Sequence, residues 1–381
     1  MTQIPYGRQW IDAEDEAAVL AALRAPMLTQ GPATQAFERE IAAYVGARHA
    51  VAVSSATAGL HLSMMALELG SGEAITSPIT FVATSNTMVH VGLTPVFADI
   101  DPATLTLSPA AVAAAITPAT RLLAPVHFAG RPADMTGLRA LADDHGLKIV
   151  EDAAHAIGSD YVGGGRVGNG AYSDLTVFSF HPVKTMTTGE GGAITTNDPA
   201  LYERLLMLRS HGITRDPTRL SDPPGPWWYE QQAMGLNYRM TDIQAALGSS
   251  QLRKLDRFID RRLAIVAEYR RAFADLAWLT LPPDAADRRI GWHLFTARID
   301  FEALGQTRAE VMAALAAKGV GSQVHYIPVT RQPWYRATYD TRPDAFPQAE
   351  AYYAQALSLP LYAAMTDDDV AQVTAAVRGL G

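Results

Sequence analysis

Three polar segments of the sequence could together carry out amine chemistry, because each lies at the end of a run of apolar residues. Lys184 follows one such run, Asp152 ends a second, and Ser-Ser-Ala-Thr-Ala-Gly at 54–59 follows a third. A lysine amine can form a Schiff base with a carbonyl compound. A carboxylate at the tip of a buried strand needs a cation, and a helix start rich in hydroxyl groups can bind phosphate. These groups suit a phosphorylated aldehyde whose ring nitrogen is protonated.

Each of these residues also has an ordinary structural interpretation. A single lysine is most often a surface charge, an aspartate can cap a turn, and serine and threonine cap many helices. Phe81 opens a helix after 77–80 and could stack on a cofactor ring, although most aromatic residues belong to the core. Ser179, five residues before Lys184, could add a phosphate donor. The combination, and none of these residues alone, favours a cofactor site.

Between residues 48 and 200, short β-rich apolar runs alternate with helical stretches, which predicts the scaffold that positions these groups. The expected strands are 49–53, 73–76, 96–100, 122–126, 148–151, 175–180 and 192–196. The expected helices are 57–69, 81–91, 109–116 and 135–145. This alternation predicts an α/β fold with a mostly parallel, seven-stranded sheet between helices. Ligands of such sheets bind beyond the carboxyl ends of the strands, where Lys184 and Asp152 are expected.

The second half of the chain predicts a smaller domain. A proline-rich surface loop at 216–229 precedes a long helix at 241–273, whose cluster of basic residues is interpreted as a solvated helix face. Further elements follow as a strand at 293–299, a helix at 308–318, a strand at 321–325 and a helix at 367–378. We therefore expect a large α/β domain at 1–255, including the N-terminal segment, and a small α+β domain at 256–381.

Composition excludes several classes of protein. The 381 residues are 48% hydrophobic and 18% charged, as in an ordinary globular protein, and include no cysteine, which rules out disulfides and thiolate metal sites. The net charge of -8 argues against nucleic acid binding. With no signal peptide and no apolar run of membrane-spanning length, a cytoplasmic protein is expected.

The histidines lack metal-ligand spacing, so no metal is expected. The glycine-rich segment 163–168 is preceded by polar residues and is interpreted as a hairpin turn, not a dinucleotide fingerprint.

Taken together, these segments resemble the DegT/DnrJ/EryC1/StrS family of sugar aminotransferases, which are fold-type I pyridoxal-phosphate (PLP) enzymes. The resemblance covers nearly the whole chain. Its motifs are Leu28-Thr-Gln-Gly31, Ser55-Ala-Thr57, Thr80-Phe-Val-Ala-Thr84, Glu151-Asp-Ala-Ala-His155, Ser179-Phe-His-Pro-Val-Lys184, Gly189-Glu-Gly-Gly192, Arg209-Ser-His-Gly212 and Asn237-Tyr-Arg-Met-Thr-Asp-Ile-Gln-Ala-Ala-Leu-Gly248. Their joint occurrence at these spacings is highly specific.

The resemblance implies a role for each matching residue. Lys184 would hold PLP as a Schiff base, Asp152 would face the pyridine nitrogen, and His155 would lie near the phenolic oxygen. Further cofactor contacts, to the phosphate or the ring, are expected from Ala56, Thr57, Phe81, Ser179 and Asn237. Asn237 would reach the phosphate from a neighbouring subunit, which implies a homodimer with a shared active site. Contacts to a nucleotide-linked sugar are expected from Tyr6, Met27, Leu28, Thr29, Gln323, Val324, His325 and Tyr326.

Within the family, segments 75–84, 226–230 and 323–326 are most similar to the C4 aminotransferases of the pseudaminic acid pathway. This implies transfer of the amino group of L-glutamate to C4 of a UDP-linked 4-keto-6-deoxy sugar, giving UDP-4-amino-4,6-dideoxy-N-acetyl-β-L-altrosamine. The alternatives are another family aminotransferase, making perosamine, 4-amino-arabinose or a 3-amino sugar, and a non-catalytic regulatory protein with a PLP fold. A sugar dehydratase of this fold needs histidine in place of Lys184 and is disfavoured.

Overall fold

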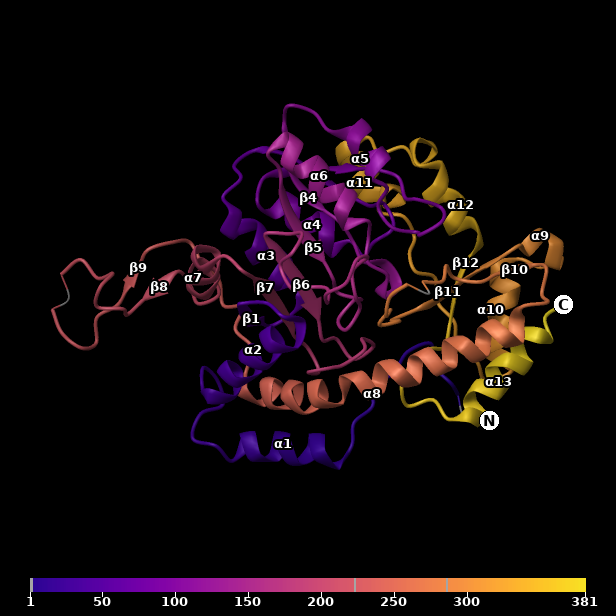
Figure 1. Ribbon diagram of the computed structural model, residues 1–381, viewed down its shortest axis with the longest axis horizontal. Helices are drawn as coiled ribbons and strands as arrows, with labels where there is room; N and C mark the ends of the chain where they lie inside the picture. Colours follow the sequence, from indigo (N-terminus) through magenta and orange to yellow (C-terminus); the bar gives the residue numbers. More distant parts are fainter. Residues whose placement is uncertain (1–2, 223, 286) are drawn as a thin grey trace.

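A seven-stranded sheet in the order β1-β7-β6-β5-β4-β2-β3 lies at the centre of the larger part of the protein (Figure 1). The computed structural model describes residues 3–222, 224–285 and 287–381. The strands are β1 (His49–Val53), β2 (Gly72–Thr76), β3 (Leu93–Phe97), β4 (Thr120–Ala124), β5 (Lys148–Asp152), β6 (Leu175–Ser179) and β7 (Gly192–Thr196). Only β7 runs antiparallel to its neighbours. The predicted seven-stranded, mostly parallel sheet is therefore confirmed.

Helices pack on both faces of this sheet, because the strands are apolar on both sides. The helices of the large part are α1 (Ala13–Leu23), α2 (Pro32–Val45), α3 (Ala56–Leu67), α4 (Ala83–His90), α5 (Pro109–Ala115), the short 3₁₀ turn η1 (Phe128–Gly130), α6 (Met135–His145) and α7 (Pro199–Leu208). One apolar cluster joins the sheet to α2, α5, α6 and the long helix α8 (Asp242–Phe273). A second cluster joins the opposite face to α3, α4 and α7. The sheet is therefore covered by a packed helical layer on each face, and the carboxyl ends of its strands lie between these two layers.

Helix α8 connects the two cores of the protein. Thr241 and Gln244 form a capping box that begins the helix. Leu255 packs in the core of the large sheet, whereas Phe273 packs in a second core around the three-stranded antiparallel sheet β10-β11-β12. The sequence predicted that the basic cluster of α8 is a solvated face. This prediction is wrong for Lys254 and Arg262, which are buried. Lys254 forms ion pairs with two aspartates of the α1 region, which offsets the cost of burial.

The smaller part combines short strands and helices. They are β10 (Leu279–Thr280), β11 (Phe295–Ile299), α9 (Phe301–Leu304), α10 (Arg308–Ala317), η2 (Val329–Arg331), α11 (Pro333–Tyr339), η3 (Pro343–Ala345), α12 (Pro347–Gln355), β12 (Ala356–Leu359) and α13 (Asp367–Arg378). The chain beyond the first core thus has the α+β composition expected for a small domain. We propose the division at 255/256 within α8, as expected from the sequence. Ile4, near the N-terminus, nevertheless packs with the second core.

Some predicted elements differ from the structure. The strand expected at 321–325 is absent: Gln323 alone pairs with Ser358 of β12, because His325 and Tyr326 then turn to line a cavity. Helices α1 and α2 and strand β12 were not predicted. The segment 163–168 does form a hairpin turn, closed by a bridge between Asp160 and Arg166.

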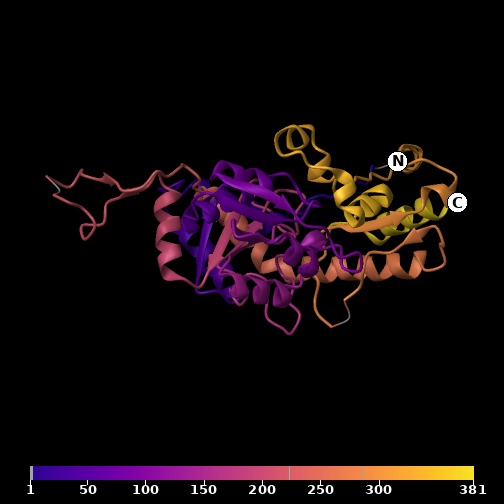
Figure 2. The same cartoon turned by 90° about the horizontal axis from the view of Figure 1, so that it is seen from above.

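The proline-rich loop lies between two short strands, β8 (Ile213–Thr214) and β9 (Glu230–Gln231), and extends away from the body of the protein as an arm (Figures 1 and 2). Pro223, one of its four prolines, lies outside the described residues. Trp227, Trp228 and Tyr229 of the arm are exposed. Within the described ranges, none of the helices is both long enough and apolar enough to cross a bilayer.

Candidate active site

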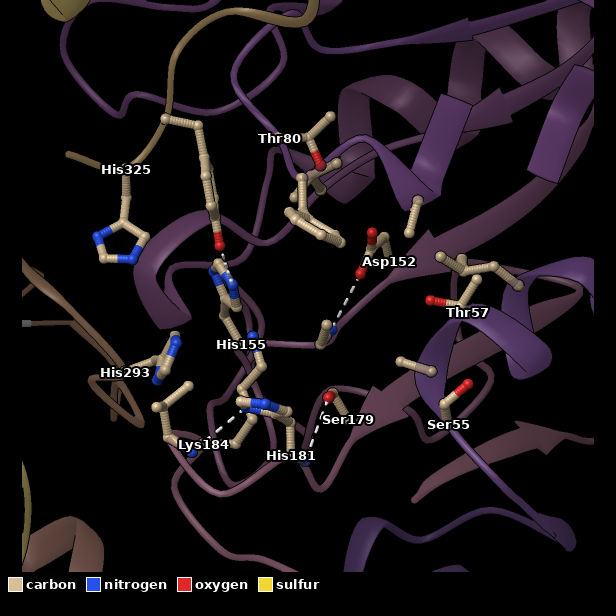
Figure 3. A pocket seen from close by; sticks show the side chains of 18 of the residues that line it. Ser55, Thr57, Thr80, Asp152, His155, Ser179, His181, Lys184, His293 and His325 are labelled. Atoms are coloured by element: carbon tan, nitrogen blue, oxygen red, sulfur yellow. Dashed lines mark hydrogen bonds between the residues drawn. The ribbon is translucent and has the colours of Figure 1, made fainter. Parts of the chain in front are cut away.

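A cavity of about 440 Å³ lies where β5 and β6 end and α3 begins (Figure 3). Its volume falls in the range of small-molecule sites, roughly 300–1,000 Å³. Most of the residues predicted for the site line this cavity: Tyr6, Ala56, Thr57, Phe81, Asp152, His155, Ser179, Lys184, His325 and Tyr326. They come from segments far apart in the sequence, so the fold brings together what the motifs only suggested.

Lys184 lies in the loop after β6, with its side chain half-buried at the cavity wall. Its backbone N–H donates to the carbonyl of His181 at 2.9 Å, which fixes the turn that presents the side chain. Burial lowers the pKa of the Lys184 amine from its usual 10.5 to about 8, although the charge of Asp152 acts in the opposite direction. Near neutral pH, a useful fraction of this amine is therefore unprotonated and can act as a nucleophile or a base.

Asp152 is the last residue of β5 and is buried, with 6% of its surface exposed. Its carboxylate accepts hydrogen bonds from the hydroxyl of Thr84 at 2.6 Å and from the backbone N–H of Ala154 at 3.1 Å. Thr84 is itself hydrogen-bonded to Thr80 at 2.8 Å. Asp152 forms no ion pair with any residue that the structure describes. A buried carboxylate held in this way is well suited to a cationic ring nitrogen in the cavity.

The start of α3 offers an anion-binding site. The first backbone N–H groups of a helix lack intrahelical partners, and here they belong to Ala56 and Thr57 at the cavity wall. Ser55 caps the helix by accepting a hydrogen bond from Ala58. A side chain at Gly192 would clash with the backbone of Ser55 and Ala56, so glycine there lets β7 pack closely against this helix start. A phosphate group fits these donors together with the hydroxyl of Ser179.

His155 and Tyr326 form a hydrogen-bonded pair in the cavity. The backbone N–H of Ala129 donates to Nδ1 of His155 at 3.3 Å, so the ring proton lies on Nε2, which is 3.1 Å from the Tyr326 hydroxyl. Burial and the charge of Lys184 hold the pKa of His155 well below its usual value, and burial raises the pKa of Tyr326. Both groups are therefore neutral. The tyrosine hydroxyl accepts from His155 and keeps its own proton to donate.

Several predicted site residues lie outside this cavity. Asn237 forms a backbone bridge with Ser210, Thr29 forms one with Thr241, and Met27 and Leu28 are exposed. Of the remaining two, Gln323 pairs with β12 and Val324 packs against the cluster that contains Phe128. Their roles remain predictions. Phe81 lines the cavity, is 59% exposed and lies with its ring centroid 6.3 Å from that of Tyr326.

Sequence reasoning missed two residues of the site. Thr84 lies within the quoted motif Thr80–Thr84, in the first turn of α4, but its bond to Asp152 was not predicted. His293 lines the cavity beside Lys184, His155 and His325 (Figure 3). No local pattern marks it, because it precedes a strand of the smaller part that packs against the cavity only in three dimensions.

Comparison with known proteins gives a consistent result. The profile described as the DegT/DnrJ/EryC1/StrS aminotransferase family matches residues 9–378. The chain is 42% identical over 379 residues to the spore coat polysaccharide biosynthesis protein SpsC of Bacillus subtilis, covering 99% of this chain and 97% of SpsC.

Two solved structures are similar over almost their whole length. Helicobacter pylori PseC, an aminotransferase involved in the biosynthesis of pseudaminic acid, superposes with a TM-score of 0.92 at 31% identity, covering 100% of this chain and 99% of PseC. The sugar aminotransferase Spr1654 of Streptococcus pneumoniae, described as putative, was solved in a PMP form and a PLP form. The PMP form has a TM-score of 0.91 at 30% identity, covering 99% of this chain and 98% of Spr1654.

Proposed function

Because this chain belongs to the DegT/DnrJ/EryC1/StrS aminotransferase family and is a PLP-dependent sugar aminotransferase, we propose that L-glutamate and a UDP-linked 4-keto-6-deoxy sugar are its substrates. The amino group would be transferred to C4 of the sugar, as in pseudaminic acid biosynthesis. The fold is that of fold-type I PLP enzymes. The similarity to PseC over the whole chain supports this choice of sugar.

The observation that carries the proposal is the convergence of Lys184, Asp152 and the start of α3 on one cavity. When bound, PLP supplies an aldehyde for the amine and a cationic ring that accepts electrons from the reacting carbon. The residues present fit this group: Asp152 would hold the ring nitrogen, and the N–H groups of Ala56 and Thr57 with Ser179 would hold the phosphate. Phe81 would cover one face of the ring.

Lys184 would act twice. Its amine would hold the cofactor, and as a free amine it would remove the proton from the α-carbon of the donor. In the second half of the reaction, it would move a proton in the reverse sense at C4 of the sugar. General acid–base transfer of this kind is worth about 10²- to 10⁴-fold in rate. The lowered pKa of about 8 keeps enough of the amine unprotonated for this role.

A homodimer with a shared active site is part of the proposal. Asn237 and the turn 27–29, expected to contact the phosphate and the sugar nucleotide, lie outside the cavity of their own chain. Met27 and Leu28 are exposed, as are the aromatic residues of the arm between β8 and β9. Exposed apolar side chains of this kind mark surfaces that bind another protein. A second copy of the chain would bring these segments to the cavity of its partner.

Replacement of Lys184 by alanine tests the assignment. We expect Lys184→Ala to lose turnover completely and to leave no label on its peptide after borohydride reduction of the PLP-loaded protein. Lys148→Ala, which removes a half-exposed lysine at the opposite end of β5, should retain both. Wild-type turnover in Lys184→Ala would overturn the assignment.

The choice of substrates has its own test. L-glutamate should convert the cofactor absorbance from the PLP form to the amine form, and UDP-linked and dTDP-linked 4-keto sugars are then offered in turn. Recovery of the PLP form with the UDP sugar is expected. Recovery with dTDP sugars alone would show that the sugar assignment is wrong.

A further inference from the structure

His293 is held by its backbone, but neither of its ring nitrogens has a hydrogen bond within the described part of the chain. Its N–H donates to the carbonyl of Ala129 at 3.0 Å, and its carbonyl accepts a hydrogen bond from Arg262 at 3.2 Å. The residue is 3% exposed, and Nδ1 of its ring is fully buried without a partner. A buried polar atom without a partner costs free energy and calls for an explanation.

The neighbouring histidines differ from His293 in this respect. His155 is bonded to Ala129 and Tyr326 through its two ring nitrogens. His325 is bonded through Nδ1 to the hydroxyl of Ser358 at 2.8 Å. The rings of His155 and His293 lie 4.4 Å apart between centroids, so His293 belongs to the same cavity wall (Figure 3). Of these three rings, His293 is the one with no hydrogen bond at either nitrogen within the described residues.

The charges around the cavity indicate which ligand this is. The amino donor is an amino acid and carries a carboxylate, yet the described residues that line the cavity include no arginine. Lys184 is assigned to the cofactor in the proposed function, and the acidic lining residues Asp152 and Glu190 repel a carboxylate. A histidine beside Lys184 whose Nε2 has no hydrogen bond is therefore a suitable donor for this group.

We propose that His293 binds the carboxylate of the amino-acid donor. This inference rests on the proposed function and names the residue by which that site recognises the donor. The charged and titratable groups facing the ring are Lys184 after β6, His155 after β5, Arg262 of α8 and His325 after α10. Burial and the charge of Lys184 hold the pKa of His293 well below its usual value, so the ring is neutral before the donor arrives. A bound carboxylate favours its protonated form, which strengthens the contact.

The test uses the PLP-loaded enzyme and glutarate, a dicarboxylate without an amino group, as the probe. Binding is measured by calorimetry for the wild type, His293→Leu, His293→Gln and the control His145→Leu, which changes an exposed histidine at the end of α6. We expect the Kd of His293→Leu to rise about 10- to 100-fold, the loss associated with one hydrogen bond to a charged group. His293→Gln, which keeps an N–H donor, should lose less, and the control should not change.

If His293 had a purely structural role, His293→Leu would lower the melting temperature. Under the proposal, leucine only removes a buried polar atom without a partner, so we expect the melting temperature of His293→Leu to be equal to or higher than that of the wild type. The KM for L-glutamate should rise with the Kd for glutarate, and the KM for the keto sugar should not. An unchanged Kd for glutarate, or a change confined to the sugar KM, would overturn the inference. The proposed function fails separately, if the wild-type cofactor spectrum does not respond to L-glutamate.

Discussion

Glu151 anchors a buried hydrogen-bond network on the face of β5 opposite Asp152. The carboxylate is fully buried and is 2.5 Å from Nε2 of His127, 2.7 Å from the hydroxyl of Tyr161 and 3.1 Å from that of Thr176. The backbone N–H of Ala133 donates to Nδ1 of His127, so Nε2 carries the proton and donates to Glu151. All three side chains are therefore donors to one carboxylate.

Replacing Glu151 by leucine should destabilise the protein strongly. The substitution leaves three buried donors without an acceptor, and each buried unpaired group costs about 1–3 kcal/mol. Relief of the desolvation of the carboxylate offsets part of this cost. We expect a loss of about 3–5 kcal/mol in the free energy of unfolding, the range found when one partner of a buried charged network is removed. Glu151→Gln keeps one acceptor oxygen, and we expect it to lose about 1–3 kcal/mol.

The loss should also depend on pH. Burial by itself raises the pKa of Glu151, but the hydrogen bonds from neighbouring side chains, His127 first, outweigh burial and lower the pKa below its usual 4.5. A carboxylate whose pKa is lower in the folded state stabilises the fold above its unfolded pKa. This contribution is lost as the pH falls through the folded pKa. The difference between wild type and Glu151→Gln should therefore be full at neutral pH and shrink in acid below about pH 4.5.

Urea unfolding of the PLP-loaded enzyme, followed by tryptophan fluorescence, measures these differences. Glu16→Gln, at an exposed position of α1, is the matched control and should change stability by less than about 0.5 kcal/mol. If Glu151→Leu unfolds within about 0.5 kcal/mol of the wild type at neutral pH, the reasoning about this network is refuted.

Two further predictions concern the cavity itself. Thr84→Val removes the hydroxyl that donates to Asp152 at 2.6 Å, so we expect the Kd for PLP to rise about 10- to 100-fold in equilibrium dialysis. Thr87→Val, whose hydroxyl bonds to backbone carbonyls of α4, is the control, and equal affinities in both variants would contradict the prediction. Because burial lowers the pKa of Lys184 to about 8, the single-turnover rate with L-glutamate should rise with pH up to about 8 and then level off. A flat profile across that range would show that Lys184 is not the base.

The sheet and the main cofactor residues were predictable because their signals are local. The alternation of strands and helices between residues 48 and 200 can be predicted from short runs of apolar residues. The carboxyl ends of parallel strands lie at one edge of a sheet. The sequence alone therefore assigns Lys184, Asp152 and the start of α3 to one site, and all three line the same cavity. The resemblance of the motifs to the family suggested a role for each of these residues. The match to the family profile confirmed the family.

Other features depend on contacts between distant segments, which no local pattern encodes. The period of α8 indicates which residues share a face, but only packing against α1 and against the segment before β11 determined that Lys254 and Arg262 of its basic cluster are buried. Likewise, the strand expected at 321–325 was replaced by a turn into the cavity, because Gln323 is the one residue of this segment that pairs with β12. Local sequence patterns therefore determined the sheet and the cofactor residues. His293 lies beside Lys184 only because the two cores pack together along α8.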